Sequence, residues 1–385
     1  MTRNCLAAWF VLAGIAAVPA LNIQPAALAQ AIPENIKSAT AVDQITPPIQ
    51  SFIRAQVGRL KGTDATARAA ARDALVSESG ATAAAGSISA AYRDVYASVL
   101  NAELATLFPA SPLETRVNAA IVAARVAPRD INAHLDGVAR AALADPQQPV
   151  ILWGLKAAAQ LIPASLSARP ANNTLLASVA KAAAANLNST LVVDAYDALT
   201  LTSHSGDIRQ LRDQIPDDRW RKLVPLVFPE LGKLWQARLE LFASGAPIDP
   251  SPERIPAVFV TSLRGNWQLM TQQQQAQAMQ WMINQLSLAG ERALQSPQEK
   301  ELFIGTVYRS TAAALLVVGE AEGNEALQTA GRSAAGLSGT AQAGTIQQAT
   351  ENVISAVRAT PKFAQLQTPP KAQSPAPTTS SRPGG

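Results

Sequence analysis

A serine, a histidine and an aspartate stand close together at Ser203, His204 and Asp207, a set of side chains that could support nucleophilic catalysis. A catalytic triad gathers these groups from separate segments, so that the hydroxyl, the imidazole and the carboxylate can line up. Neighbouring loop residues seldom reach that geometry. The pattern therefore favours a polar turn in which Ser205 or Asp207 caps the next short helix. His204 and Asp207 remain weak candidates for contact with a ligand.

The other histidine, His134, has Asp130 one helical turn before it. This spacing predicts a hydrogen-bonded pair on the surface of a helix, a far more common arrangement than a catalytic dyad. Since the chain has only these two histidines, acid–base and metal chemistry based on imidazole is severely restricted.

No metal or cofactor site is predicted. The sequence has no H-E-x-x-H motif, no cysteine cluster and no third histidine to complete a zinc site. Glu320, Glu322 and Glu325 form an acidic patch, which the first turn of a helix explains. An EF-hand loop begun there would place Glu325 where glycine is required and Gly331 where glutamate is required. Neither G-x-G-x-x-G nor G-x-x-x-x-G-K follows a strand pattern, so we expect no nucleotide cofactor.

The sequence around Trp220 interleaves charges with an aromatic ring, which could suit an anionic or sugar ligand. Arg219 and Arg221 flank the ring, and Asp217 and Asp218 come just before it. The alternative, which we favour, is a helix start with acids in its first turn and Trp220 on the core face. Arg219, Trp220 and Arg221 are therefore kept as weak candidates for ligand contact.

The body of the chain is electrically neutral, and the net positive charge lies at its C-terminal end. The formal charge of +4 equals the charge of residues 358 to 385, which contain four basic residues and no acid. A nucleic-acid-binding protein usually has a basic patch or stripe on its folded domain. The neutral body therefore argues against nucleic acid as a partner.

The first 29 residues have the pattern of a cleavable signal peptide. A short n-region precedes an uncharged apolar run from Cys5 to Pro19, and Ala27-Leu28-Ala29 supplies the small residues of a cleavage site. The alternative is an uncleaved N-terminal anchor, although the apolar run is shorter than the roughly 20 residues of a good membrane span. We expect a secreted or periplasmic protein. Because Cys5 is the single cysteine, its mature chain would have neither disulfides nor thiolate metal ligands.

Apolar residues recur at three- and four-residue spacing along nearly the whole chain, and the alternation typical of strands hardly appears. This predicts an all-α protein. Ser111-Pro112-Leu113-Glu114 and Ser296-Pro297-Gln298-Glu299 both match a capping box with proline at the first helical position, so each predicts a helix start. The longest apolar run after the signal, Ala312 to Val318, fits a buried helix segment. We therefore expect no membrane span after signal cleavage.

Between residues 109 and 205 the predicted helices form short pairs, which begin near positions 111, 145 and 189. Such spacing lies within the range of two-helix repeats, whose units must stack to bury their apolar faces. The stretch resembles HEAT or armadillo-type repeats, most clearly where Asp145-Pro146-Gln147-Gln148-Pro149-Val150 leads into an apolar helix. The resemblance implies a curved helical scaffold that binds a partner, and it implies no chemistry.

A change in helix length divides the predicted body near residue 245. Residues 30 to 245 form the repeat-like domain, and residues 246 to 360 form a C-terminal helical subdomain with longer helices. Residues 319 to 344 contain six glycines, which predict a weak or mobile helix pair. Residues 361 to 385 contain six prolines among Ser, Thr and Gln, which predict a disordered basic tail.

Three functional interpretations follow, of which the third is a purely structural spacer with no concave surface and no retained partner. The leading one is an exported, non-enzymatic helical scaffold that binds a protein or a cell-envelope polymer, with the basic tail contacting anionic envelope material. It rests on the absence of catalytic motifs and on the stacked helices. The alternative is an enzyme that acts on cell-envelope polysaccharide through Asp or Glu alone, although the sequence selects no pair of carboxylates. A deep polar cleft with convergent buried carboxylates would favour the enzyme.

Overall fold

The structure is a computed structural model that describes residues 31–80, 88–108, 110–130, 132–200, 215–262 and 265–373. Within these ranges the regular elements are all helices and none is a strand, which confirms the predicted all-α class. The predicted signal peptide lies outside the described residues. The first half contains α1 (Glu34–Ser38), α2 (Val42–Leu60), α3 (Ala65–Glu78), α4 (Ala90–Ala105), α5 (Leu113–Val126), η1 (Ala127–Arg129), α6 (Asp136–Leu143), α7 (Gln148–Ser167), α8 (Thr174–Ala184) and α9 (Leu191–Thr200).

The second half contains the two longest helices of the described chain, α11 with 27 residues and α14 with 24. A π-helical turn, η3, interrupts the last long apolar stretch before α16. The elements are α11 (Asp217–Ala243), η2 (Ser251–Glu253), α12 (Arg254–Val260), α13 (Asn266–Leu269), α14 (Gln272–Gln295), α15 (Lys300–Leu302), η3 (Phe303–Tyr308), α16 (Arg309–Ala321), α17 (Glu325–Ala335), α18 (Ala343–Arg358) and η4 (Pro361–Phe363).

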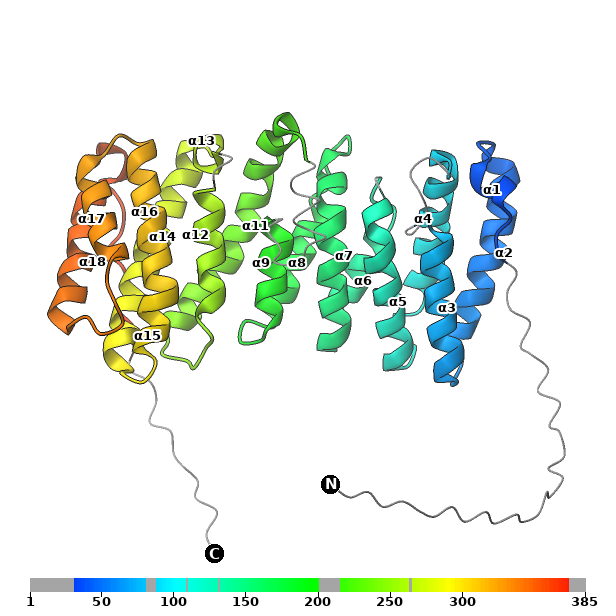
Figure 1. The fold of residues 1–385 in the computed structure, drawn as a ribbon, viewed down its shortest axis with the longest axis horizontal. Coiled ribbons are helices and arrows are strands. Elements are labelled where there is room, and N and C mark those ends of the chain that lie inside the picture. Colours follow the sequence, from blue (N-terminus) through cyan, green and yellow to red (C-terminus); the bar gives the residue numbers. More distant parts are fainter. Residues whose placement is uncertain are drawn as a thin grey trace, which may run out of the picture.

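The helices form two layers that run along the length of the molecule (Figure 1). In one layer α2, α4, α6, α8, α11, α14 and α18 contact one another in that order. In the other layer the order of contacts is α3, α5, α7, α9, α12, α16 and α17. The body is therefore elongated, and each helix buries its apolar face against near neighbours in the sequence.

Helix α5 begins close to the predicted start, but the predicted capping box does not form. Pro112 has an extended ψ of 155° and is itself the N-cap, so the helix begins at Leu113 without a side-chain cap. Ser111 is thereby displaced one residue outside the position from which a hydroxyl can reach the first turn. The box predicted at Ser296 is also absent, because the short helix α15 begins only at Lys300.

One hydrophobic core continues through both predicted domains. The predicted boundary at residue 245 lies in the loop after α11, yet α9 contacts α12 and α11 contacts α14 across it. A buried polar network crosses the same boundary: Tyr196 Oη donates to Glu253 Oε2 over 3.0 Å, and Arg238 Nε donates to Glu253 Oε1 over 2.6 Å. Gln285 Nε2 donates to the Glu253 carbonyl oxygen over 3.0 Å. Packing and hydrogen bonds thus join the two halves.

The glycine-rich segment forms a closely packed helix pair rather than the weak pair that its composition predicts. A Cβ atom added at Gly331 would lie 2.9 Å from the Leu316 nitrogen, and one at Gly319 would lie 2.9 Å from the Gln328 nitrogen. Real Cβ atoms essentially never approach a backbone atom so closely. The glycines therefore let the backbones of α16 and α17 come together.

Residues 361 to 373 lie against the body, whereas the sequence predicts that the disordered tail begins at Pro361. The Phe363 ring is 1% exposed, and its centroid is 6.2 Å from that of Trp267. Leu366 also packs against the core. These two apolar side chains, together with hydrogen bonds to the backbone of Gln367 and Ala372, hold a segment whose composition is otherwise that of a disordered chain. Residues 374 to 385 lie outside the described residues.

Two helical stretches are long and apolar enough to cross a membrane, although the sequence analysis expected none after the signal: Gln148–Ser167 and Lys300–Ala321. In each, most of the apolar window is buried inside the body, 67% and 56% respectively. The core helix of a soluble protein meets the same criterion. The second stretch is longer than the seven-residue run from Ala312 to Val318, because the helix also continues on the N-terminal side of that run, through η3.

Candidate functional site

Trp220, the centre of the predicted ligand-contact run, lies in the core on α11. Its side chain is 3% exposed, and its Nε1 donates to Asn266 Oδ1 over 2.7 Å. The ring meets Phe259 edge to face, with 6.3 Å between ring centroids. A ligand in solvent cannot stack on this ring. Trp220 therefore lies on the core face of its helix, as the favoured interpretation of the sequence predicts.

The two arginines beside Trp220 point to different surroundings. Arg219 reaches the end of α7, where its Nε donates to Ser167 Oγ over 2.7 Å and its guanidinium donates to the Pro163 carbonyl oxygen over 2.9 Å. Arg221 is exposed. These residues therefore do not converge on a shared site. His204 and Asp207 lie outside the described residues.

His134 does not lie in mid-helix and does not pair with Asp130. It occupies the turn before α6, and its Nε2 is 3.7 Å from Asp94 Oδ1. Asp130 is 4% exposed, and its Oδ2 accepts a hydrogen bond from the Leu135 backbone nitrogen over 2.6 Å. The spacing predicts one continuous helix through Asp130 and His134, but the helix ends earlier because Pro128 lies in the 3₁₀ turn η1 just before Asp130.

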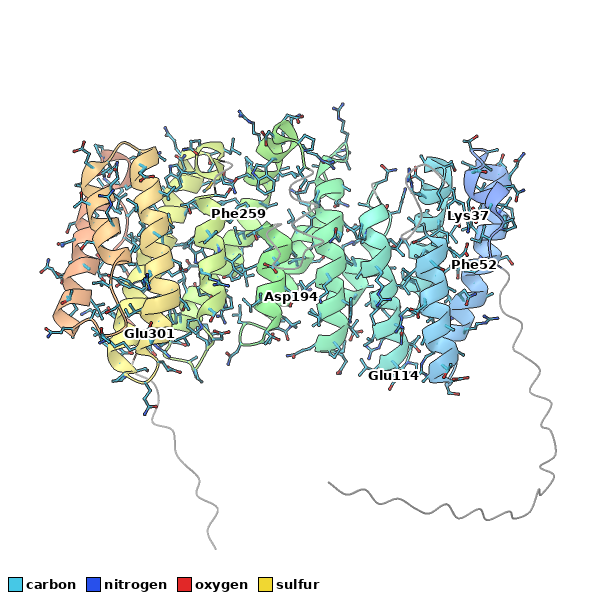
Figure 2. All side chains as sticks on the ribbon, in the orientation of Figure 1. Lys37, Phe52, Glu114, Asp194, Phe259 and Glu301 are labelled. Carbon is cyan, nitrogen blue, oxygen red and sulfur yellow. The ribbon has the colours of Figure 1, made fainter. Side chains whose placement is uncertain are left out.

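The candidate site is a pair of hollows at the edge where α4, α6 and α8 end. Ala144, Asp145 and Pro146, in the turn between α6 and α7, line both hollows and form the ridge between them. Glu114, near the beginning of α5, marks this edge in Figure 2. We call the two hollows together the Asp145 groove.

The first hollow has a volume of about 430 Å³ and lies between the ends of α6 and α8. Two cationic side chains, Arg140 and Lys181, line it together with Ser178 and Asn186. The second hollow, of about 560 Å³, lies on the other side of the ridge toward the end of α4. Its lining is Phe108, Ala110, Ser111, Arg116, Ala141, Ala144, Asp145 and Pro146.

Asp145 is buried and is held in place by two partners. Its side chain is 1% exposed, with Oδ2 accepting from the Arg116 guanidinium and Oδ1 accepting from the Gln147 backbone nitrogen over 2.9 Å. Arg140 donates to Asp136 Oδ2 over 3.1 Å and stays 45% exposed. Lys181 is exposed and forms no ion pair within the described part of the chain. Arg116 and Arg140 are therefore each paired with a carboxylate, and Lys181 is the cation of the groove that pairs with none in the described part of the chain.

The lining of the groove contains hydroxyl groups and cationic side chains. Ser111 and Ser178 provide hydroxyls, but the one histidine that the structure describes, His134, lines neither hollow. A serine nucleophile needs a base within hydrogen-bond reach. Among the described residues no group of three metal-ligating side chains could hold a metal ion. What remains is a polar, cationic surface with a partly apolar floor.

Among the described residues, three carboxyl groups have raised pKa values, and they lie in different parts of the fold. Burial raises the pKa of Glu253 within the network of Arg238 and Tyr196, and burial raises the pKa of Asp194 on α9. Burial also raises the pKa of Asp136, with a smaller contribution from the charge of Asp130. Neither Asp130 nor Asp136 lines the Asp145 groove.

Sequence reasoning missed the residues of this groove as candidates. Asp145 and Pro146 were noticed only as the start of a repeat-like helix, and the cations lie one turn before the ends of their helices. A signal was available, because Arg140 and Lys181 both stand in the last turn of a predicted helix and close to a turn. Cations there also interact favourably with the helix dipole, so this signal alone does not separate a binding site from ordinary helix stabilisation.

No protein-family model matches the chain, and no curated protein matches it in sequence. Among solved structures, two crystal structures of engineered proteins are similar, each at 13% sequence identity. They cover 81% and 84% of this chain and 96% and 97% of their own, with TM-scores of 0.29 and 0.28. At such scores the likeness carries no conclusion about fold or function.

Proposed function

We propose that this protein is an exported, non-enzymatic helical scaffold, built from stacked helix pairs of the HEAT or armadillo kind, that binds a protein or a cell-envelope polymer. The binding surface in this proposal is the Asp145 groove. The observation that carries it is the placement of the exposed Lys181, together with the partly exposed and ion-paired Arg140, beside a hollow of about 430 Å³. Cation-lined grooves attract partners that bear carboxylates or phosphates.

Three cations of the basic C-terminal segment lie beside neighbouring groups, and one of them, Lys362, is paired with a carboxylate. Lys362 Nζ donates to Glu322 Oε1 over 2.7 Å, and Arg358 donates to Thr368 Oγ1 over 3.0 Å. Lys371 lines a hollow beside Glu291 and Glu351. We therefore assign first contact with an anionic partner to the groove rather than to residues 358 to 373.

The test is a crosslinked pull-down from cell-envelope fractions with three forms of the full chain. Lys181→Glu reverses the charge of the exposed cation in the groove, and we expect the retained partner to be lost or strongly reduced. Arg221→Glu makes the same change at an exposed position of α11 outside the groove and serves as the matched control. If both variants retain the partner equally well, the Asp145 groove is not the binding surface.

The alternative function, an enzyme acting on envelope polysaccharide, draws on one observation. Asp136 lies close enough to Asp130 for the charge of one carboxyl to raise the pKa of the other, and its Oδ2 accepts hydrogen bonds from Arg140 and Asn172. Glycoside cleavage uses two such carboxyl groups. If envelope polysaccharide is cleaved, Asp136→Asn should abolish the cleavage, whereas Lys181→Glu should leave the rate per bound substrate unchanged.

A further inference from the structure

Residues 364 to 373, which we call the strap, lie along α14 and are held mainly through their backbone. Gln280 binds both backbone groups of Gln367: its Nε2 donates to the Gln367 carbonyl oxygen over 3.2 Å, and its Oε1 accepts from the Gln367 nitrogen over 2.7 Å. Farther along α14, Glu291 Oε2 accepts from the Ala372 nitrogen, and Gln295 Nε2 donates to the Ala372 carbonyl oxygen over 3.1 Å. The side chains of one helix thus satisfy both backbone groups at two positions of the strap.

The spacing of these contacts matches an extended peptide. Gln280 and Glu291 are separated by about 16 Å along the axis of α14, at roughly 1.5 Å per residue. The five steps from Gln367 to Ala372 cover about 17 Å when the chain is extended. Pro369 and Pro370 lie between the two contacts, where their lack of a backbone N–H loses no donor to α14.

A hollow of about 350 Å³ remains beside the strap, between α14 and α18. Glu291 and Glu351 line it, Leu294 and Ile354 form apolar parts of its wall, and Lys371 of the strap borders it. An aliphatic chain that ends in a positive charge suits this lining, because its stem can cover the apolar wall while its head meets the carboxylates.

From these contacts we propose that the α14 face is a binding groove for an extended, proline-containing basic segment of another polypeptide, and that the strap occupies this groove in cis. Contacts to backbone atoms fix the extended conformation of the bound segment. The hollow with its two carboxylates selects a lysine or arginine at the position of Lys371. The surface is separate from the Asp145 groove and does not depend on it.

The experiment uses the full chain with the strap loosened and α14 left intact. Gln367→Pro together with Ala372→Pro removes the two strap N–H donors that Gln280 and Glu291 accept. Gln367→Ala together with Ala372→Gly changes the same positions but keeps both donors, and it is the matched control. The probe is a fluorescent synthetic peptide with the sequence of residues 361–373, and binding is followed by fluorescence anisotropy.

We expect the loosened chain to bind the peptide about tenfold or more tightly than the control chain, because an occupied groove lowers apparent affinity by the fraction that is free. In the loosened chain, Gln280→Ala should weaken binding, and so should a peptide carrying Lys371→Glu. Equal or absent binding by the loosened and control chains would overturn the proposal, provided that circular dichroism shows the loosened chain folded. A dimer of the loosened chain that Gln280→Ala dissociates would assign the groove to a second copy and overturn the proposal of a separate partner.

Discussion

Arg238 and Glu253 form an ion pair in the centre of the molecule, with Nε and Oε1 2.6 Å apart and side chains that are 2% and 0% exposed. Both terminal nitrogens of the guanidinium also donate, to the carbonyl oxygens of Leu187 and Asp249. Such a buried pair adds little net stability. Removing one partner is nevertheless costly, because it leaves an unpaired charge in the core. The pair therefore makes the folding of the two halves interdependent.

We expect Glu253→Ala to lower the free energy of unfolding by about 3 to 5 kcal/mol, the usual cost of breaking a buried ion pair. The matched control is Lys233→Ala, on the same helix as Arg238. This change breaks the ion pair between Lys233 and Glu230, in which the lysine side chain is 67% exposed. That change should cost less than about 1 kcal/mol. Urea unfolding followed by circular dichroism measures both. Similar losses in the two variants would show that the buried pair has no special role.

The close approach of α16 and α17 gives a second prediction. Gly331→Ala places a Cβ atom 2.9 Å from the Leu316 nitrogen and 3.2 Å from the Ala312 carbonyl oxygen, and neither backbone atom can move aside cheaply. Overpacking of this kind costs about 1 to 3 kcal/mol, which outweighs the gain of up to about 1 kcal/mol in helix propensity.

Gly344→Ala in α18 is the control for that change, because a Cβ atom there would meet nothing within 4 Å. It should leave stability unchanged or raise it by up to about 1 kcal/mol. Thermal unfolding of the two variants decides the matter: a gain in Tm for Gly331→Ala would mean that the helices are not held together at this glycine.

Helix capping gives a third prediction. At the start of α14 the Thr271 hydroxyl accepts from the Gln274 nitrogen over 3.2 Å, and the Gln274 side chain accepts from the Thr271 nitrogen over 3.0 Å. Thr271→Ala should therefore lower stability by about 1 kcal/mol. Ser111→Ala, at a position that the sequence also matches to a capping box, should have little effect because Pro112 is the N-cap of α5. If Ser111→Ala proves the more costly change in denaturant unfolding, the cap assignment is wrong.

The sequence predicted the helical class and several helix positions because apolar spacing is a local property. The expectation of helices along nearly the whole chain follows directly from it, and so does the start of α5 near Ser111. The sequence does not predict details that depend on a single backbone torsion. The motif at Ser111 matches a capping box, yet the extended ψ of Pro112 moves the helix start by one residue.

The candidate sites could not be predicted because they are made of residues distant in the sequence. Arg116 and Asp145 meet only when α5 packs beside the turn before α7, and Gln280 meets Gln367 only when the strap folds back on α14. Local composition also gave a wrong prediction where packing determines the structure. By its low helix propensity Gly331 should weaken its helix, yet it allows α16 and α17 to pack closely. The burial of Trp220, in contrast, could be predicted from local sequence, because it follows from the position of this residue in an amphipathic helix.

The last prediction concerns pH and the carboxyl of Asp194, which lies on α9 and is labelled in Figure 2. Burial raises its pKa above the ordinary aspartate value of 3.8, although the charge of Lys156 acts in the opposite direction. A carboxyl whose pKa is higher in the folded state stabilises the fold when it is protonated, and this contribution is lost as the pH rises from 3.8 through the folded pKa. At neutral pH the ionised Asp194 therefore disfavours folding.

Asp194→Asn removes the buried charge and keeps the size of the side chain. We expect the variant to have the higher Tm at pH 7 and to lose this advantage progressively as the pH is lowered toward 3.8, because the wild-type carboxyl then takes up its proton in the folded state. Thermal unfolding of both chains at several pH values in constant salt gives the difference directly. A difference in Tm that stays constant over this range, or a variant less stable at pH 7, would show that burial does not control this carboxyl.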